Sequence, residues 1–328
     1  MDRRNTARWF LCLALALGAG SSITPVFSQP AWPTRALSVV VPYPPGGNTD
    51  VITRVVMEKL SSRIGQPVVV ENKPGAGGII GSSFVAKAAP DGYTFLIAIP
   101  GFALNQSLYK ELPYRPDDLQ PVALLTRTSL VLVTNSTIPA RNFTELLDYG
   151  RKAAPPLTFA SSGPGSMAYI LSERFLRATG IEQSTHVPYK GSADALTDLV
   201  GGRIGFMFDA VSAMGPHIQQ GRVLAMAVTG TDRSPMLPEV PTISELGHPE
   251  LVTYAWAGLL APAGVPVDIT RRLASELHAV LHELDVVTRL AAINTEPVGS
   301  SPEEFSSFLD KEVAIGKETI TRTGLALQ

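Results

Sequence analysis

The sequence predicts an α/β protein of two domains, the second of which is inserted into the first. The chain has 328 residues, which is more than a typical single core requires. Strand-like and helix-like segments alternate over residues 38–105 and again over residues 157–228, as in parallel sheets with helical crossovers. Two apolar runs, Val122–Leu125 and Leu130–Val133, have no helix between them, which favours a strand that crosses between the domains.

The domain boundaries follow from this pattern. We expect the first domain to contain residues 33–126 and 253–328, and the second to contain residues 127–252. Ligands of open parallel sheets bind outside the carboxyl ends of the strands, so we predict a central ligand cleft. Hinge strands are expected near Thr126–Leu130 and Thr253–Trp256.

The N-terminus is typical of a secretory signal peptide over residues 1–28. Three arginines precede an apolar segment, Phe10–Ala19, which is too short to span a membrane. A retained anchor is the alternative. Cys12, the single cysteine, lies inside this segment, so the exported chain is expected to be free of cysteine and periplasmic. Removal of three Arg and one Asp leaves 24 basic and 28 acidic residues, a net charge of −4 that argues against a nucleic-acid partner.

The first strand–helix corner is the most informative stretch of the first domain. Val39–Val41 is a buried strand, Pro42, Pro44 and Pro45 end it, and Gly46-Gly47 leads into a helix that ends at Gly65. We expect Asn48 or Thr49 to cap that helix. The pattern fits an anion-binding corner or an ordinary strand-to-helix connection equally well.

Two further strands complete the first parallel sheet. Strands are expected at residues 67–71 and 93–100, with a glycine-rich loop over 72–78 and a helix to Ala88 between them. Residues 101–105 are expected to form a loop. The loops after Val41, Glu71 and Ile99 would then share one edge of the sheet.

The second domain repeats the alternation. We expect helices at residues 142–152 and 192–200, strands at 157–160, 205–209 and 223–228, and a short strand and loop at 186–191. Residues 254–260 are the return strand. Helices near 267–283 and 286–292, and one that begins at the capping box Ser301–Glu304, are expected to cover the first sheet.

Three catalytic or cofactor motifs fit the chain poorly. Gly75–Gly81 departs from a dinucleotide fingerprint because Ile80 occupies its last glycine position. His278 and His282 have zinc-ligand spacing but lack the glutamate of H-E-x-x-H. The Ser161–Ser166 loop lacks G-x-S-x-G. We therefore expect no cofactor, no metal and no catalytic residue. The serine loop either binds a carboxylate or only precedes a helix that Ser162 or Ser166 caps.

The chain resembles the Bug-type receptors of tripartite tricarboxylate transporters, which are periplasmic solute-binding proteins. The matching blocks follow in order through most of the chain: Val41–Gly47 with Asp50, Val70–Gly78, Ala89–Tyr93, Ala160–Gly163, His186–Gly191, Met207–Asp209, Arg233–Pro235, Pro238–Thr242 and Leu260–Gly264. The resemblance implies a type II periplasmic-binding-protein fold that closes on a small carboxylate. It also implies membrane transporter subunits as partners, with a sensor protein or a hydrolase on the same scaffold as alternatives.

The resemblance also implies a set of ligand-binding residues. From the first domain these are Tyr43, Gly46, Gly47, Asn48 and Asp50. From the second they are Ser161, Ser162, Ser166, Tyr189 and Asp209. Asp209 ends a strand, so it can instead cap the next helix. Tyr43 and Phe102 differ from the residues common in the family, and we expect both rings to flank the far end of the ligand.

Overall fold

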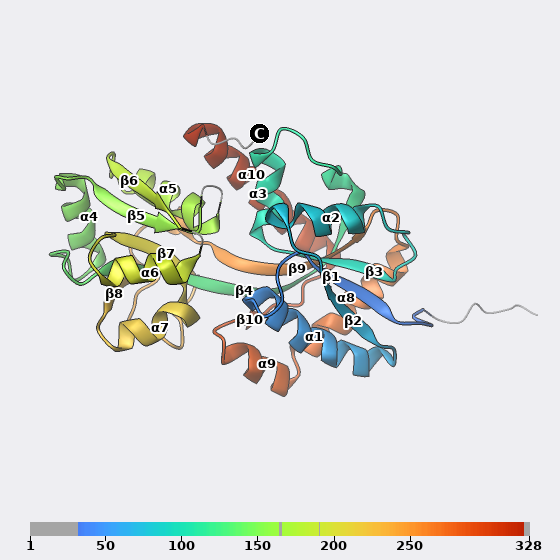
Figure 1. Cartoon of the computed structure of the whole chain (residues 1–328). Coiled ribbons are helices and arrows are strands. Elements are labelled where there is room, and N and C mark those ends of the chain that lie inside the picture. Colours follow the sequence, from blue (N-terminus) through green and yellow to red (C-terminus); the bar gives the residue numbers. More distant parts are fainter. Residues whose placement is uncertain (1–31, 164–165, 190, 325–328) are drawn as a thin grey trace, which may run out of the picture. The chain divides into compact units, whose positions relative to one another are not determined.

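The computed structural model describes residues 32–163, 166–189 and 191–324, and the segment predicted as a signal peptide lies outside them. Ten strands form one hydrogen-bonded sheet in the order β2-β1-β3-β9-β4-β7-β5-β6, with β10 and β8 also paired to β4 (Figure 1). The strand bounds are β1 Leu37–Val41, β2 Val68–Asn72, β3 Thr94–Ala98, β4 Leu119–Asn135, β5 Leu157–Ser161, β6 Ser184–Pro188, β7 Phe206–Ala210, β8 Val223–Val228, β9 Tyr254–Pro262 and β10 Glu296–Pro297.

Two parallel groups of strands lie on either side of the antiparallel pair β4 and β9. Strands β2, β1 and β3 are parallel, and so are β7, β5 and β6. β4 pairs with β9 up to Ser129 and with β7 from Leu130 onward. The prediction of one crossing strand is therefore confirmed, since the two apolar runs form a single strand of 17 residues.

Helices follow most strands, as the alternation predicted. Their bounds are α1 Asn48–Ile64, α2 Ile79–Ala86, α3 Pro100–Leu108, α4 Phe143–Lys152, α5 Met167–Ala178, α6 Ser192–Val200, α7 Val211–Gln219, α8 Val267–Leu281, α9 Leu284–Ala291 and α10 Pro302–Thr323. Short 3₁₀ turns lie at Ala76–Gly78, Pro116–Asp118 and Pro249–Leu251.

Two local predictions were wrong. Residues 101–105 belong to α3, because Pro100 starts the helix and the buried side chains of Phe102 and Leu104 outweigh the low helix propensity of Gly101. The N-cap of α1 is Gly47, with no side-chain cap, so neither Asn48 nor Thr49 caps that helix.

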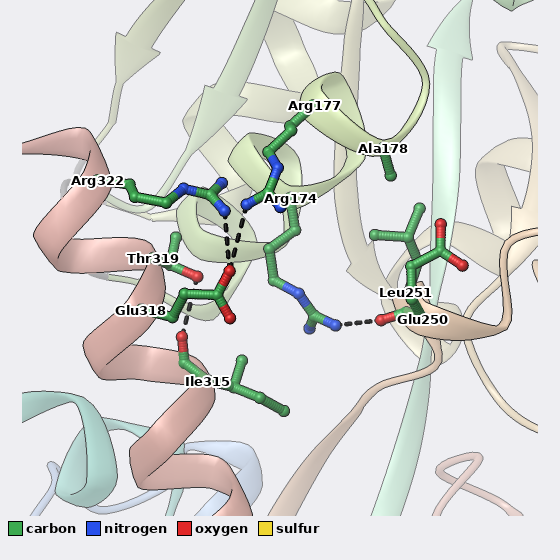
Figure 2. Close-up of a pocket in the computed structure, with 9 residues that line it drawn as sticks. All are labelled: Arg174, Arg177, Ala178, Glu250, Leu251, Ile315, Glu318, Thr319 and Arg322. Carbon is green, nitrogen blue, oxygen red and sulfur yellow. Dashed lines mark hydrogen bonds and ion pairs between the residues drawn. The ribbon is translucent and has the colours of Figure 1, made fainter.

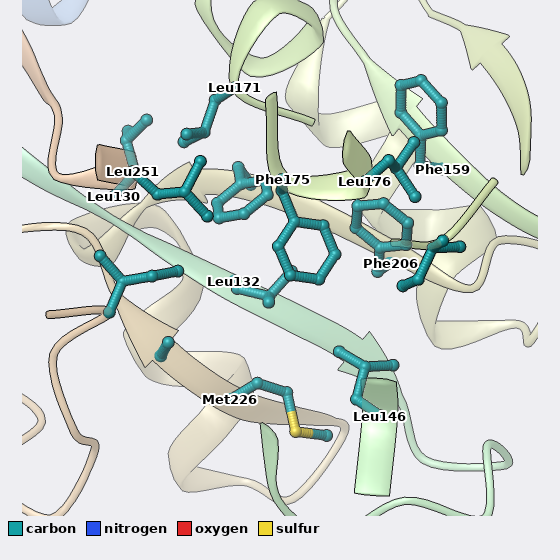
Figure 3. Packing of buried hydrophobic residues seen from close by; sticks show 14 of the residues in the cluster. Leu130, Leu132, Leu146, Phe159, Leu171, Phe175, Leu176, Phe206, Met226 and Leu251 are labelled. Carbon is teal, nitrogen blue, oxygen red and sulfur yellow. The ribbon is translucent and has the colours of Figure 1, made fainter. Parts of the chain in front are cut away.

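The C-terminal helix α10 connects two hydrophobic clusters. It begins at the predicted capping box, where the Ser301 side chain accepts from the Glu304 amide. Phe305 is fully buried against Trp256, with ring centroids 5.9 Å apart. Near the other end of the helix, Ile320 belongs to a second cluster of buried residues. Figure 3 shows Phe175 and Phe206 of that cluster packed among leucines. The helix therefore packs on the central strands β4 and β9 and on α3, and near its C-terminal end it reaches α5.

Candidate functional site

A cavity of about 150 Å³ lies where the strands β5 and β7 end. Three predicted site residues line it: Ser161, Ser162 and Asp209. The other lining residues come from β4, α5, α6, β7 and β9, namely Leu130, Met167, Ala168, Ser192, Ala195, Met207, Phe208 and Ala255. The structure thus brings together the ends of two parallel strands and the first residues of α5 and α6, as expected for a ligand site in such a sheet.

Asp209 carries a buried carboxylate oxygen that lacks a partner. Its Oδ1 accepts from the Ala210 amide at 2.7 Å, whereas Oδ2 is buried and makes no hydrogen bond to any described residue. Burial raises the pKa of Asp209, and the Ser192 hydroxyl and the Ala210 amide only partly oppose it. Asp209 does not cap α7, whose N-cap is Ala210. A buried oxygen of this kind requires a donor, which a ligand or a water molecule can supply.

Ser161 and His186 form a close pair that resembles a nucleophile and a base. The Ser161 Oγ lies 2.8 Å from the His186 Nε2 and also exchanges hydrogen bonds with the amide and carbonyl of Gly163, both at 3.1 Å. Burial lowers the pKa of His186, which favours the neutral ring. When the Nε2 of the ring donates to Oγ, the hydroxyl proton of Ser161 is free to donate to the Gly163 carbonyl; in the other tautomer it donates to the ring. In both tautomers the pair connects β5 to β6 and to the serine loop.

Ser166 and Tyr189 have local partners in the same region. The Ser166 Oγ accepts from the Tyr169 amide at 3.2 Å, so Ser166 is the N-cap of α5 and the capping interpretation holds for this residue. The Tyr189 hydroxyl donates to Asp198 Oδ2 at 2.7 Å, and burial together with that carboxylate raises the pKa of Tyr189 to about 12. Neither residue lines the cavity.

A second cavity, of about 80 Å³, lies beside the first group of strands. Asn48 lines it, together with residues of α1, β4 and β9 and with the start of α3: Thr49, Ile52, Ile99, Pro100, Thr126, Thr128, Ala255, Trp256 and Ala257. Ala255 of β9 lines both cavities. The two cavities therefore share one strand as a wall.

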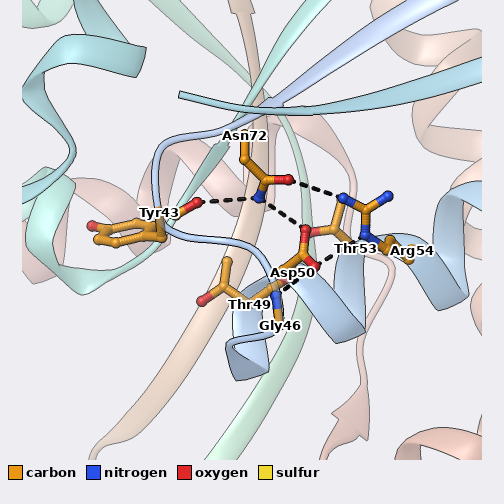
Figure 4. Close-up of polar contacts among 7 residues, drawn as sticks. All are labelled: Tyr43, Gly46, Thr49, Asp50, Thr53, Arg54 and Asn72. Carbon is orange, nitrogen blue, oxygen red and sulfur yellow. Dashed lines mark hydrogen bonds and ion pairs between the residues drawn. The ribbon is translucent and has the colours of Figure 1, made fainter. Parts of the chain in front are cut away.

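Asp50 holds the loop before α1 and does not face either cavity. Its Oδ2 accepts from the Gly46 amide at 2.9 Å and from Arg54 at 3.0 Å, and its Oδ1 accepts from Asn72 at 2.9 Å (Figure 4). Asn72 also donates to the carbonyl of Tyr43. These contacts lower the pKa of Asp50 to about 2, chiefly through the Arg54 hydrogen bond. Its predicted contact with ligand stays a prediction, and within the described residues its carboxylate holds Gly46, Arg54 and Asn72.

The remaining predicted residues of the first domain shape the same loop. Gly46 has a φ of +81°, which favours glycine, and Gly47 is the N-cap of α1. A Cβ at Gly78 or at Gly101 would lie 3.0 Å from the Tyr43 hydroxyl, so the Tyr43 side chain packs against the 3₁₀ turn at Ala76–Gly78 and the start of α3. Phe102 is only 5% exposed and stacks on Tyr114, which places it in the core and argues against the predicted contact with ligand.

Four helix N-termini supply the positive end of the candidate site. Asn48 and Pro100 begin α1 and α3 at the smaller cavity, and Met167 and Ser192 begin α5 and α6 at the larger one. Each N-terminus carries roughly half a positive charge and free N–H groups. Within the described chain, no Lys, Arg or His lines either cavity.

Sequence reasoning missed Ser192, Thr126, Thr128 and Ala255. A weak signal existed for Ser192, because it follows Gly191 at a predicted helix start. Thr126 and Thr128 are two residues apart on β4, so they share one face of the strand. Ala255 carries no chemical signal, and only the pairing of β9 with β4 places it at the site.

The two weak cofactor motifs have structural roles. A Cβ at Gly81 would lie 2.7 Å from Pro42, so the glycine-rich segment packs against the first loop. The His278 Nδ1 donates to the Gly299 carbonyl, and the His282 Nδ1 donates to the His278 carbonyl. Among the described residues, no group of three or more His, Cys, Asp or Glu is placed to hold a metal ion.

Comparison with solved structures identifies the fold as that of the periplasmic binding proteins. R. palustris Rpa4515 with adipate has a TM-score of 0.76 and 35% identity, with 90% of this chain and 99% of that one covered. MatC from Rhodopseudomonas palustris with bound malate has a TM-score of 0.71 and 32% identity, with 88% and 100% covered. The type II periplasmic-binding-protein fold expected from the resemblance is therefore confirmed. The expected class, a solute-binding protein, is confirmed as well.

The family is equally clear from the sequence comparisons. The model of the tripartite tricarboxylate transporter family receptor matches residues 52–325. Protein BugT of Bordetella pertussis is 35% identical over 99% of this chain and 100% of its own length. The chain belongs to the tripartite tricarboxylate transporter receptor family. In the described part of the chain, no helix is long and apolar enough to cross a membrane.

Proposed function

We propose that this protein is a periplasmic receptor that captures a small organic carboxylate and delivers it, unchanged, to the membrane subunits of a tripartite tricarboxylate-type transporter. The observation that carries the proposal is the convergence of four helix N-termini on the two cavities, where no described Lys, Arg or His lines the walls. Oriented N–H groups neutralise a carboxylate without a point charge. Family membership and the adipate and malate complexes of two relatives support the same ligand class.

Asp209 and Ser162 are proposed to set the orientation of the ligand. The Oδ2 of Asp209 is buried without a partner among the described residues, so a donor on the ligand, or a water molecule held with it, would complete its hydrogen bonds. The Ser162 hydroxyl is exposed at the larger cavity. The two domains, residues 33–126 with 253–328 and residues 127–252, would close around the ligand by bending β4 and β9 where β4 exchanges partners.

Thermal melting with a panel of acids tests this proposal. We expect malate, adipate or a related acid to raise the melting temperature, and the methyl esters of the same acids to have no effect, because a ligand that binds only the folded state stabilises it. Asp209→Asn and Ser162→Ala should weaken the response, whereas Ser62→Ala, an exposed hydroxyl on α1, should not.

Mass spectrometry of the recovered acid separates a receptor from an enzyme. A receptor returns the ligand unaltered after prolonged incubation, whereas a hydrolase consumes it. If no acid stabilises the protein, or if the bound acid is converted, the proposed function is wrong. A signalling partner in place of the transporter would leave both results unchanged and would be recognised by co-purification with a sensor protein.

A further inference from the structure

A cavity lined by three arginines lies apart from the candidate site. It has a volume of about 400 Å³ and is formed by α5, the 3₁₀ turn at Pro249–Leu251 and the C-terminal half of α10 (Figure 2). Its walls carry three guanidinium groups and two carboxylates, from Arg174, Arg177, Arg322, Glu250 and Glu318. None of these residues lines the two cavities described above.

Arg174 brings an incompletely paired cation to this cavity. Its Nη2 donates to the backbone carbonyl of Glu250, and no carboxylate oxygen of any described residue lies within 4 Å of its guanidinium. Burial lowers the pKa of Arg174, against the opposing charges of Glu312, Glu318 and Glu250. A partly buried guanidinium has five N–H donors, and a single carbonyl leaves most of them available to an anion.

Arg177 and Arg322 mark the position of an anionic oxygen. Both donate to the same atom, Glu318 Oε1, at 3.3 and 2.9 Å (Figure 2). The Glu318 side chain is 64% exposed, so these ion pairs contribute little to stability and are open to competition. A dissolved oxyanion with more charge than one carboxylate can therefore replace Glu318 between the two arginines.

We propose that this cavity is a second anion site, which binds a small polyvalent oxyanion such as phosphate or sulfate through Arg174, Arg177 and Arg322. The planar guanidinium groups suit tetrahedral or planar oxyanions, which accept forked hydrogen bonds. Glu318 acts as an internal competitor that occupies part of the site when the anion is absent. The proposal is independent of the carboxylate site, which uses different residues and neutral donors.

Titration calorimetry of the full chain with inorganic phosphate, at constant ionic strength maintained with chloride, tests the proposal. We expect saturable binding, weakened about tenfold by Arg174→Gln or Arg322→Gln, because each change removes a charged hydrogen bond. Glu318→Gln should tighten binding, because it removes the competitor and leaves the arginines in place. Arg222→Gln, which removes an exposed arginine elsewhere, should change nothing.

Two results would overturn the proposal. The first is a response to phosphate no greater than that to chloride, or one that survives both arginine substitutions. The second is loss of phosphate binding in Asp209→Asn, which would place the phosphate in the carboxylate site. Phosphate binding that persists in Asp209→Asn, while the carboxylate response is lost, supports both sites and distinguishes them. Sulfate in place of phosphate distinguishes recognition of a dianion from recognition of a protonated phosphate.

Discussion

Asp50→Asn is the sharpest test of how the first loop is held. The substitution keeps the size of the side chain but removes the charge that the Gly46 amide, Arg54 and Asn72 contact. The fall in pKa from 3.8 to about 2 corresponds to about 2.4 kcal/mol at 1.36 kcal/mol per pKa unit. Asp50 is 5% exposed but its partner Arg54 is 50% exposed, so solvent screening reduces this to about 1–2 kcal/mol.

The pH dependence gives this prediction its specificity. Because the folded pKa is lower than the unfolded one, the stabilisation is complete well above pH 3.8 and is lost as pH falls towards about 2. About half of the stabilisation by the ionised Asp50 should be lost by pH 3. Melting curves should therefore show Asp50→Asn roughly 2–6 °C below the native protein at pH 7, with a smaller difference at pH 3.

Asp285 provides a matched control for Asp50. Asp285→Asn makes the same charge change at an exposed pair with Lys59 and should leave the melting temperature nearly unchanged. Equal stability of Asp50→Asn and the native protein at pH 7 would refute the reasoning, as would a difference that does not narrow in acid. Asp50→Asn should also weaken carboxylate binding, because the loop at the start of α1 loses its anchor.

Three further substitutions test packing and capping by denaturant unfolding. Gly258→Ala places a Cβ about 2.1 Å from the Phe305 ring and should lower the free energy of unfolding by about 3 kcal/mol. Adding Phe305→Leu should restore part of that stability. An unchanged free energy of unfolding would mean that α10 does not pack against β9 as described. Phe206→Ala removes a fully buried ring that contacts Phe159 and Phe175, and should lower the free energy of unfolding by about 3–5 kcal/mol. The loss should be larger than that caused by Phe206→Leu. Ser301→Ala removes the N-cap of α10 and should cost about 1 kcal/mol, whereas Ser307→Ala within the helix should cost less; equal effects would contradict the capping role.

The strands could be predicted from the sequence because a strand that is buried on both faces consists of consecutive apolar residues. Val39–Val41 and Leu130–Val133 are continuous apolar runs, and both form strands in the structure. The helix α3 was missed because a local reading weighs Gly101 heavily, whereas burial of Phe102 and Leu104 depends on the sheet beneath them. Residue type alone therefore fails where tertiary burial overrides helix propensity.

The candidate site was predictable to the extent that it lies at strand ends. Ser161 and Asp209 end β5 and β7, which topology places next to each other in the sheet. The contribution of β9 was not predictable, because the register that brings Ala255 opposite Thr128 is a long-range pairing. Likewise, the sequence shows that Asp50 is near a helix start, but not that Asn72 and Arg54 occupy its carboxylate.

The distribution of cations over the molecule has a physical consequence for selectivity. Helix N-termini at the two central cavities offer partial charges at fixed positions, so they favour an anion whose oxygens match the direction of the N–H groups. A lysine or arginine in the same walls would attract any anion and would follow it on flexible bonds. Three arginines instead line the cavity between α5 and α10, where their attraction for anions is broad and is screened by salt. Fixed dipoles therefore suit the proposed carboxylate site, which would have to distinguish one carboxylate from another, and mobile guanidinium groups suit the proposed second site, which would recognise mainly charge.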